Sequence, residues 1–117
     1  MWLILFKTLE GVPYYGDRPD AIDNGDARIE TYDFSIGQEY EDLLEEDFIN
    51  PMYNLCGSLV DIDESDFFDV EKCAMLVNWL ENRFRQEVHP VLKPVYEKIL
   101  EYAQKAIEYG TGIIIQF

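Results

Sequence analysis

Short, mainly apolar runs occur near both ends of the chain. The first covers residues 2–7, and the second covers residues 111–117 and is rich in β-branched isoleucine. A short apolar run bounded by turn residues is typical of a buried strand. We therefore expect both terminal segments to lie in one sheet, as its central strands.

Two helices are predicted ahead of the second strand. Over residues 70–86 the apolar positions recur at intervals of three and four, which places them on one face of a helix, and Asp69 is suited to be its N-cap. Residues 94–109 show a similar pattern and precede Gly110, the residue type favoured just after a helix end. The chain is thus expected to end as helix, glycine, strand.

The first half of the chain has a weaker pattern. Residues 27–34 alternate loosely between apolar and polar types, which favours a strand. Residues 11–25 are rich in glycine, proline, aspartate and asparagine, which predicts an exposed loop.

A third helix is predicted over residues 36–48, because Ser35 and Gln38 have the spacing of a capping box. Residues 50–68 contain proline and glycine and are expected to form a loop, with a short strand near 58–62. With 117 residues there is room for one domain. The predicted fold class is therefore α/β: a single small domain, residues 1–117, whose sheet packs against about three helices.

Charge is distributed unevenly along the chain. The sequence has 24 acidic and 9 basic residues, a net charge of −15. Residues 1–69 hold 18 acidic and 3 basic side chains, whereas residues 70–117 hold 6 of each. A protein with this much negative charge is repelled by nucleic acids and anionic membranes. Neither is therefore expected as a partner. The asymmetry favours an acidic surface that binds a basic protein, although a merely solvated face is the simpler alternative.

The remaining composition points to a soluble, cytoplasmic protein without catalytic function. The N-terminal apolar run lacks the features of a signal peptide, and no run is long enough to span a membrane. Cys56 and Cys73 are interpreted as two buried thiols, although one disulfide between them stays open. Neither cysteine forms a recognisable nucleophile pair with His89, the only histidine. No cofactor or enzymatic motif is expected.

A metal site is the alternative interpretation of one acidic segment. Asp61, Asp63 and Asp66 could bind a divalent cation or serve a small enzyme. An EF-hand loop starting at Asp61 would need glycine at its sixth position and glutamate at its twelfth, where this chain has Asp66 and Lys72. The EF-hand interpretation therefore fails, and the segment is more simply an acidic approach to the helix that follows.

Two acidic groups are the candidate partner-binding residues. One group lies on the predicted helix over residues 36–48 and the other lies in the loop before it, beside two tyrosines. The candidates are Glu39, Glu41, Asp42, Glu45 and Glu46 on the helix, and Tyr14, Tyr15, Asp17, Asp20 and Asp23 in the loop.

Two segments resemble a known family. Residues 12–23 (Val-Pro-Tyr-Tyr-Gly-Asp-Arg-Pro-Asp-Ala-Ile-Asp) and residues 101–115 are similar to a tyrosine-rich segment and to the last helix, turn and strand of the barstar family. That resemblance implies an acidic α/β inhibitor of a ribonuclease, with Tyr14, Asp20 and Asp23 as contacts.

More broadly, the chain resembles in type the small acidic immunity proteins of bacterial contact-dependent growth inhibition and polymorphic toxin systems. The expected function is therefore neutralisation of a basic toxin, such as a nuclease. An acidic nucleic-acid mimic that blocks a DNA-binding protein is the alternative.

Overall fold

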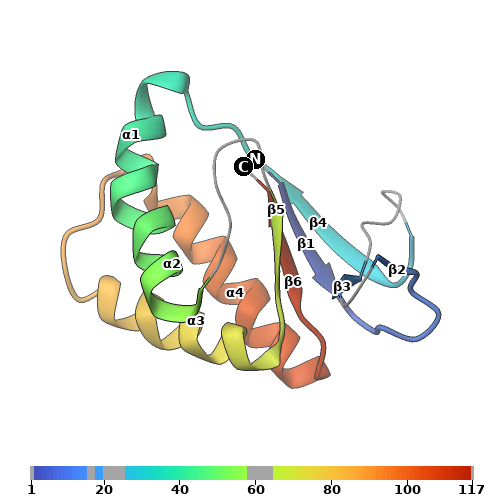
Figure 1. Cartoon of the computed structure of the whole chain (residues 1–117). Helices are drawn as coiled ribbons and strands as arrows, with labels where there is room; N and C mark the ends of the chain where they lie inside the picture. Colours follow the sequence, from blue (N-terminus) through green and yellow to red (C-terminus); the bar gives the residue numbers. More distant parts are fainter. Residues whose placement is uncertain (1, 16–17, 20–25, 58–64, 117) are drawn as a thin grey trace.

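The two terminal strands lie side by side in the middle of a four-stranded sheet (Figure 1). The structure, a computed structural model, describes residues 2–15, 18–19, 26–57 and 65–116. The sheet has the order β4-β1-β6-β5, and its neighbouring strands are antiparallel: β1 (Trp2–Phe6), β4 (Ile29–Asp33), β5 (Ser65–Phe68) and β6 (Ile113–Gln116). The prediction that both terminal strands are central is confirmed.

Both faces of β1 are buried, which explains its uninterrupted apolar sequence. Leu3 and Leu5 belong to the main core beneath the helices, whereas Ile4 and Phe6 belong to a second apolar cluster on the opposite face. The segment after β1 contributes Leu9 to this second cluster. Neither face can therefore accept the polar residues that a half-exposed strand would carry.

The two helices of the second half are confirmed, together with the residues that bound them. α3 spans Val70–Arg83 and α4 spans Lys93–Tyr109. The Asp69 side chain accepts a hydrogen bond of 2.9 Å from the backbone N–H of Lys72, as an N-cap does. Gly110 follows α4 with a φ of 70°, a conformation that costs glycine less than any other residue.

The third helix is longer than predicted. It runs without interruption through η1 (Gln38–Tyr40, a 3-10 turn), α1 (Glu41–Leu44), η2 (Glu45–Ile49, a π-helical turn) and α2 (Asn50–Cys56). The prediction of a loop from residue 50 onward is wrong for residues 50–56. We call this whole segment, residues 38–56, the long helix.

The π-helical turn explains why Pro51 does not end the long helix. A proline inside an α-helix lacks an N–H and clashes with the carbonyl group four residues earlier. Here the preceding turn is widened, because the backbone N–H of Asn50 donates to the carbonyl oxygen of Glu45, five residues back. Pro51 then falls in the first turn of α2, where a missing N–H costs little.

The predicted capping box is also wrong. The residue before the first helical turn is Gly37, and no side chain caps that turn. Since the helix begins at Gln38, Ser35 lies too far upstream to accept the hydrogen bond that a capping box requires.

The loop regions contain two further short elements. β2 (Tyr14–Tyr15) and β3 (Arg18–Pro19) pair as an antiparallel hairpin within the segment that was expected to be loop. The strand predicted near residues 58–62 lies outside the described residues, and β5 begins at Ser65.

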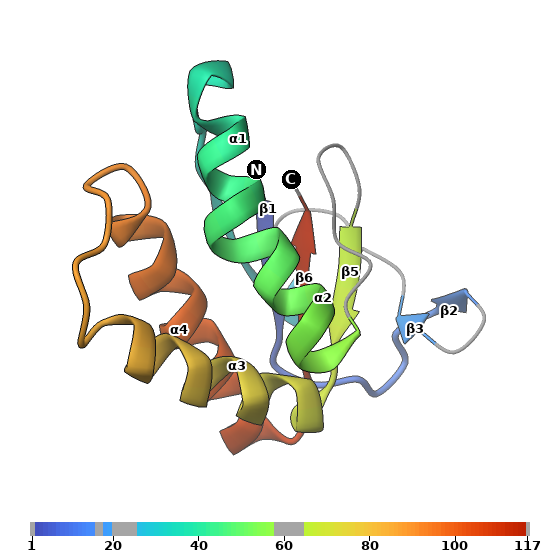
Figure 2. The same cartoon turned by 60° about the vertical axis from the view of Figure 1, so that its left-hand side comes forward.

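The long helix, α3 and α4 form one layer over one face of the sheet (Figures 1 and 2). Three aromatic rings join this layer: Phe48 lies 5.8 Å from Trp79 and 5.7 Å from Tyr96, and Trp79 lies 5.9 Å from Tyr96, between ring centroids. The predicted small α/β domain with three packed helices is therefore confirmed. Within the described ranges, no helix is long and apolar enough to cross a membrane.

Candidate functional site

The acidic helix residues that were predicted to bind a partner form an exposed ridge. Four of the five side chains are exposed and one, Glu41, is half-buried. None of the five forms an ion pair with another described residue. No lysine or arginine lies within the long helix. We call this set the acidic ridge: Glu39, Glu41, Asp42, Glu45 and Glu46.

Asp47, the next acidic residue, is paired inside the protein. Its carboxylate accepts hydrogen bonds from Arg83 Nη2 at 2.8 Å, from Arg83 Nε at 3.3 Å and from the Tyr96 hydroxyl at 2.6 Å. Arg83 also donates through Nη1 to the carbonyl oxygen of Glu87 at 2.9 Å. We call Asp47, Arg83 and Tyr96 the latch, because they join the long helix to both α3 and α4.

Two of the three latch residues, Tyr96 and Arg83, have raised pKa values. Burial, and then the hydrogen bond to Asp47, raise the pKa of the Tyr96 phenol far above its ordinary value. The hydrogen bond to Asp47 also raises the pKa of the Arg83 guanidinium. Tyr96 therefore stays a hydrogen-bond donor and Arg83 a cation at neutral pH. Together they hold the acidic ridge on a fixed helical platform.

The start of the long helix has a second contact, with the turn between α3 and α4. The Tyr40 ring lies 5.5 Å from the His89 ring, and His89 Nδ1 accepts a hydrogen bond of 3.1 Å from the backbone N–H of Val91. The only histidine is thus occupied in shaping a turn.

Tyr14 lies on the other side of the sheet from the acidic ridge. The hairpin that carries it projects from the face opposite the helices in both views (Figures 1 and 2). Its side chain is half exposed, at 50%. Nothing is described of the Tyr15 side chain, and Asp17, Asp20 and Asp23 lie outside the described residues. Among the candidates whose side chains are described, Tyr14 therefore lies on a different surface from the five helix residues.

Arg28 ties the segment between β1 and β2 to the sheet. Its Nη1 donates to the carbonyl oxygen of Gly11 at 2.7 Å, and its Nη2 lies 2.8 Å from Asp26 Oδ2. The hydrogen bonds from Arg28 lower the pKa of the Asp26 carboxyl to about 2. These contacts hold in place the segment that leads into the hairpin carrying Tyr14.

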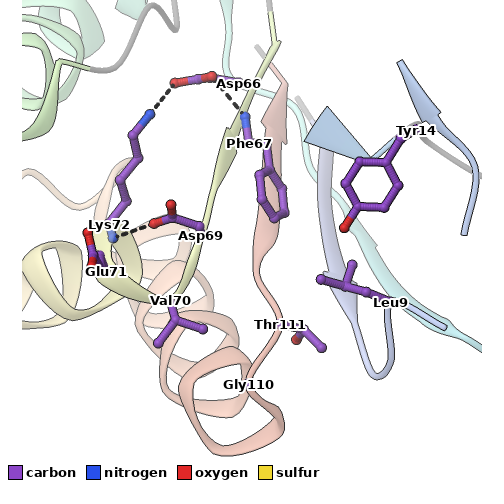
Figure 3. A pocket seen from close by; sticks show the side chains of 10 residues that line it. All are labelled: Leu9, Tyr14, Asp66, Phe67, Asp69, Val70, Glu71, Lys72, Gly110 and Thr111. Atoms are coloured by element: carbon purple, nitrogen blue, oxygen red, sulfur yellow. Dashed lines mark hydrogen bonds and ion pairs between the residues drawn. The ribbon is translucent and has the colours of Figure 1, made fainter. Parts of the chain in front are cut away.

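Beside Tyr14 lies a groove of about 660 Å³ that follows β5 and the first turn of α3. Figure 3 shows Phe67 projecting from β5 toward the Tyr14 side, and Asp66 and Asp69 projecting on the other side of the strand. We call this the β5 groove, and its lining residues are Leu9, Tyr14, Asp66, Phe67, Asp69, Val70, Glu71, Lys72, Gly110 and Thr111.

Asp66, one of the three residues of the metal hypothesis, is engaged within this groove. Its carboxylate lies 3.6 Å from Lys72 Nζ and accepts a hydrogen bond of 2.9 Å from the backbone N–H of Phe67. Asp61 and Asp63 lie outside the described residues. Among the residues that are described, no three histidine, cysteine or acidic side chains are placed to hold a metal ion.

The two cysteines are free thiols. Cys73 is fully buried, donates to the carbonyl oxygen of Phe68 at 3.3 Å, and has its pKa raised by burial to about 12. A thiol with that pKa is not a thiolate at neutral pH, so Cys73 is a core residue. Cys56 is half-buried at the end of the long helix and donates to the carbonyl oxygen of Met52 at 3.4 Å.

Two features of these surfaces were not predicted from the sequence. The latch was not predicted because Asp47 lies 36 and 49 residues from its two partners, although Tyr96, three residues before the buried Ile99, shares a helix face with it. The β5 groove was missed because its walls come from four separate parts of the chain.

Comparisons with protein-family models, with curated proteins and with solved structures give no match for this chain.

Proposed function

We propose that this protein is an inhibitor that binds a basic protein through the acidic ridge, as the immunity proteins of bacterial toxin systems do. The partner would be a toxin, such as a nuclease, that is neutralised in the cytoplasm. No catalytic group is required of this chain for that role. The observation that carries the proposal is the unpaired state of all five ridge carboxylates among the described residues.

The contrast with Asp47 gives this observation its weight. In the same helix, Asp47 forms an ion pair with Arg83, whereas the five ridge residues that precede it form none with another described residue. Like charges along a helix destabilise it by a few tenths of a kcal/mol per pair. A cationic partner removes this repulsion, so the free protein carries a cost that binding relieves.

The platform beneath the ridge suits a binding surface. The Phe48, Trp79 and Tyr96 rings and the latch hold the long helix against α3 and α4. A surface that is already ordered loses little conformational entropy on association. The ridge would therefore attract the partner over a distance and meet it in a fixed geometry.

A pair of charge-reversal variants tests the proposal. Asp42→Lys with Glu46→Lys alters two exposed ridge residues, and Glu81→Lys with Glu108→Lys makes the same change of net charge at exposed sites on α3 and α4. Neither control residue takes part in an ion pair with another described residue. The two double variants have equal net charge, so a difference between them reports position.

The assay has two stages. Proteins retained by the immobilised chain from a lysate of its source organism are identified and purified. Their association is then followed by stopped flow at several salt concentrations, and their activity is measured with and without this chain. We expect the ridge variant to lose at least about tenfold in association rate constant, and the control variant less than about twofold. Equal losses would refute the ridge as the binding surface, and a bound partner that keeps full activity would refute inhibition.

A further inference from the structure

The sheet has two outer strands, β5 and β4, and their edges differ in how open they are to another strand (Figure 1). At the β5 edge, the backbone N–H of Phe67 donates to the carboxylate of its neighbour Asp66 at 2.9 Å. A carboxylate folded over a strand edge hinders the addition of another strand. β4 has no comparable protection: its five residues pair with β1 in an unbroken register, and they include no proline or lysine.

Backbone hydrogen bonds at the end of β1 show which groups of β4 point outward. The N–H of Lys7 donates to the carbonyl oxygen of Arg28, just before β4, at 2.8 Å. The N–H of Phe6 donates in the opposite direction, to Gly112 just before β6, at 3.1 Å. This direction alternates from residue to residue along an antiparallel strand. Every second residue of β4 counted from Arg28 therefore faces β1, and the residues between them face outward.

Thr31 and Asp33 are the outward-facing residues that leave the β4 edge open. Within the described part of the chain, neither backbone N–H has a hydrogen-bond partner. Ile29 also faces outward, but its N–H donates to the carbonyl oxygen of Asp26 at 3.2 Å. The backbone groups of Thr31 and Asp33 therefore have the spacing that an added extended strand requires.

A hollow of about 360 Å³ lies beside this edge, between β4 and the flank of α4. Tyr32 lines it from β4 and packs against the main core, which places the hollow on the helical face of the sheet. Directly opposed residues of paired strands direct their side chains to the same face. An added strand would therefore direct the side chain opposite Tyr32 toward the hollow. The lining residues are Tyr32, Pro94, Glu97, Lys98 and Glu101.

The charge beside the β4 edge favours a basic strand. Within the hollow, Glu101 accepts a hydrogen bond of 2.8 Å from Lys98. Glu97 and Asp33 are exposed and form no ion pair with another described residue. A second copy of this chain, with its net charge of −15, would bring further negative charge to the edge. A lysine-rich or arginine-rich segment would instead meet opposite charge.

We propose that an extended, basic segment of a protein partner adds to the edge of β4 as a fifth strand of the sheet. Main-chain hydrogen bonds to Thr31 and Asp33 would supply affinity. A lysine or arginine side chain directed into the hollow beside Glu97 would supply selectivity. The site shares no lining residue with the acidic ridge and does not depend on the function proposed for the ridge.

The probe is the blocked peptide acetyl-Thr-Lys-Val-Lys-Thr-amide, whose valine would lie opposite Thr31 and whose lysines would face the helical side. One control peptide carries N-methylated valine, which lacks the N–H donor, and another carries glutamine in place of both lysines. Each is titrated into ¹⁵N-labelled protein at 150 mM NaCl, so that the general attraction of an acidic protein for cations is screened.

We expect saturable amide shifts with a dissociation constant of about 1 mM. The shifts should alternate along β4 and be larger at Thr31 and Asp33, which face the peptide, than at Glu30 and Tyr32, which face β1. N-methylation should weaken binding at least about fivefold, because it removes a main-chain hydrogen bond. Replacement of the lysines should weaken it at least about threefold.

Two single variants and two double variants complete the test. Glu97→Gln should weaken binding of the lysine peptide at least about twofold, whereas Glu108→Gln, at an exposed site near the end of α4, should leave it unchanged. The ridge variant and its charge-matched control, defined above, should bind the peptide equally, which separates this site from the proposed function. Equal binding of the N-methylated peptide, shifts centred on the acidic ridge, or self-association of the chain through β4 would overturn the proposal.

Discussion

The latch offers a quantitative test of how the acidic ridge is held. Tyr96→Phe removes one hydroxyl group from a fully buried side chain, the one that donates to Asp47 at 2.6 Å. Phenylalanine keeps the ring and its contacts with Phe48 and Trp79, so no large cavity forms. Asp47 also keeps its two hydrogen bonds from Arg83. The substitution therefore isolates a single hydrogen bond to a charged group.

The expected loss of stability follows from that geometry. A hydrogen bond to a charged group contributes about 1.5–3 kcal/mol. The entropy of unfolding is about 2.1 cal/mol/K per residue near the melting temperature, which for 117 residues gives about 0.25 kcal/mol per degree. Tyr96→Phe should therefore lower the melting temperature by about 6–12 °C.

Tyr109→Phe is the matched control. Tyr109 ends α4 and its side chain is 45% exposed, so the same change of one hydroxyl group should alter the free energy of unfolding by less than about 0.5 kcal/mol. Both variants would be followed by thermal and urea unfolding, monitored by circular dichroism. If Tyr96→Phe is no less stable than Tyr109→Phe, the latch does not stabilise the protein and this reasoning fails.

Three further predictions concern the core. Gly112→Ala should lower the free energy of unfolding, measured in urea, by about 2 kcal/mol, because the new Cβ would meet the Phe68 carbonyl oxygen and lie 2.6 Å from the Phe67 ring. An unchanged midpoint of urea unfolding would contradict this close approach. A thiol reagent at pH 8 should modify Cys56 in the native protein and reach Cys73 only after unfolding, and rapid reaction of both thiols would contradict the burial of Cys73. Stability should fall above about pH 10. The pKa of Tyr96 is raised above its ordinary value of 10.0, so the native state keeps a proton that the unfolded chain loses, and Tyr96→Phe should flatten this dependence.

Much of the fold could be predicted from local patterns, because the relevant signals are local. The runs at 2–7 and 111–117 are more continuously apolar than a half-exposed strand would be. A strand that is buried on both faces requires such a run. The bounds of α3 and α4 follow from Asp69 and Gly110, since caps act on the backbone beside them. The acidic ridge was predictable in the same way, because six acidic residues within one helical segment leave most of them facing solvent.

Only the tertiary structure decided the rest. The long helix continues past Pro51 because a π-helical turn removes the local clash, and local propensity counts proline as a helix breaker. Asp47 looks like its acidic neighbours in the sequence, but its partners lie 36 and 49 residues away on other helices. Tyr14 and the ridge both belong to the acidic half of the chain, yet the sheet separates them. Composition and periodicity report how one segment meets solvent or core, whereas ion pairs and grooves depend on which segments meet each other.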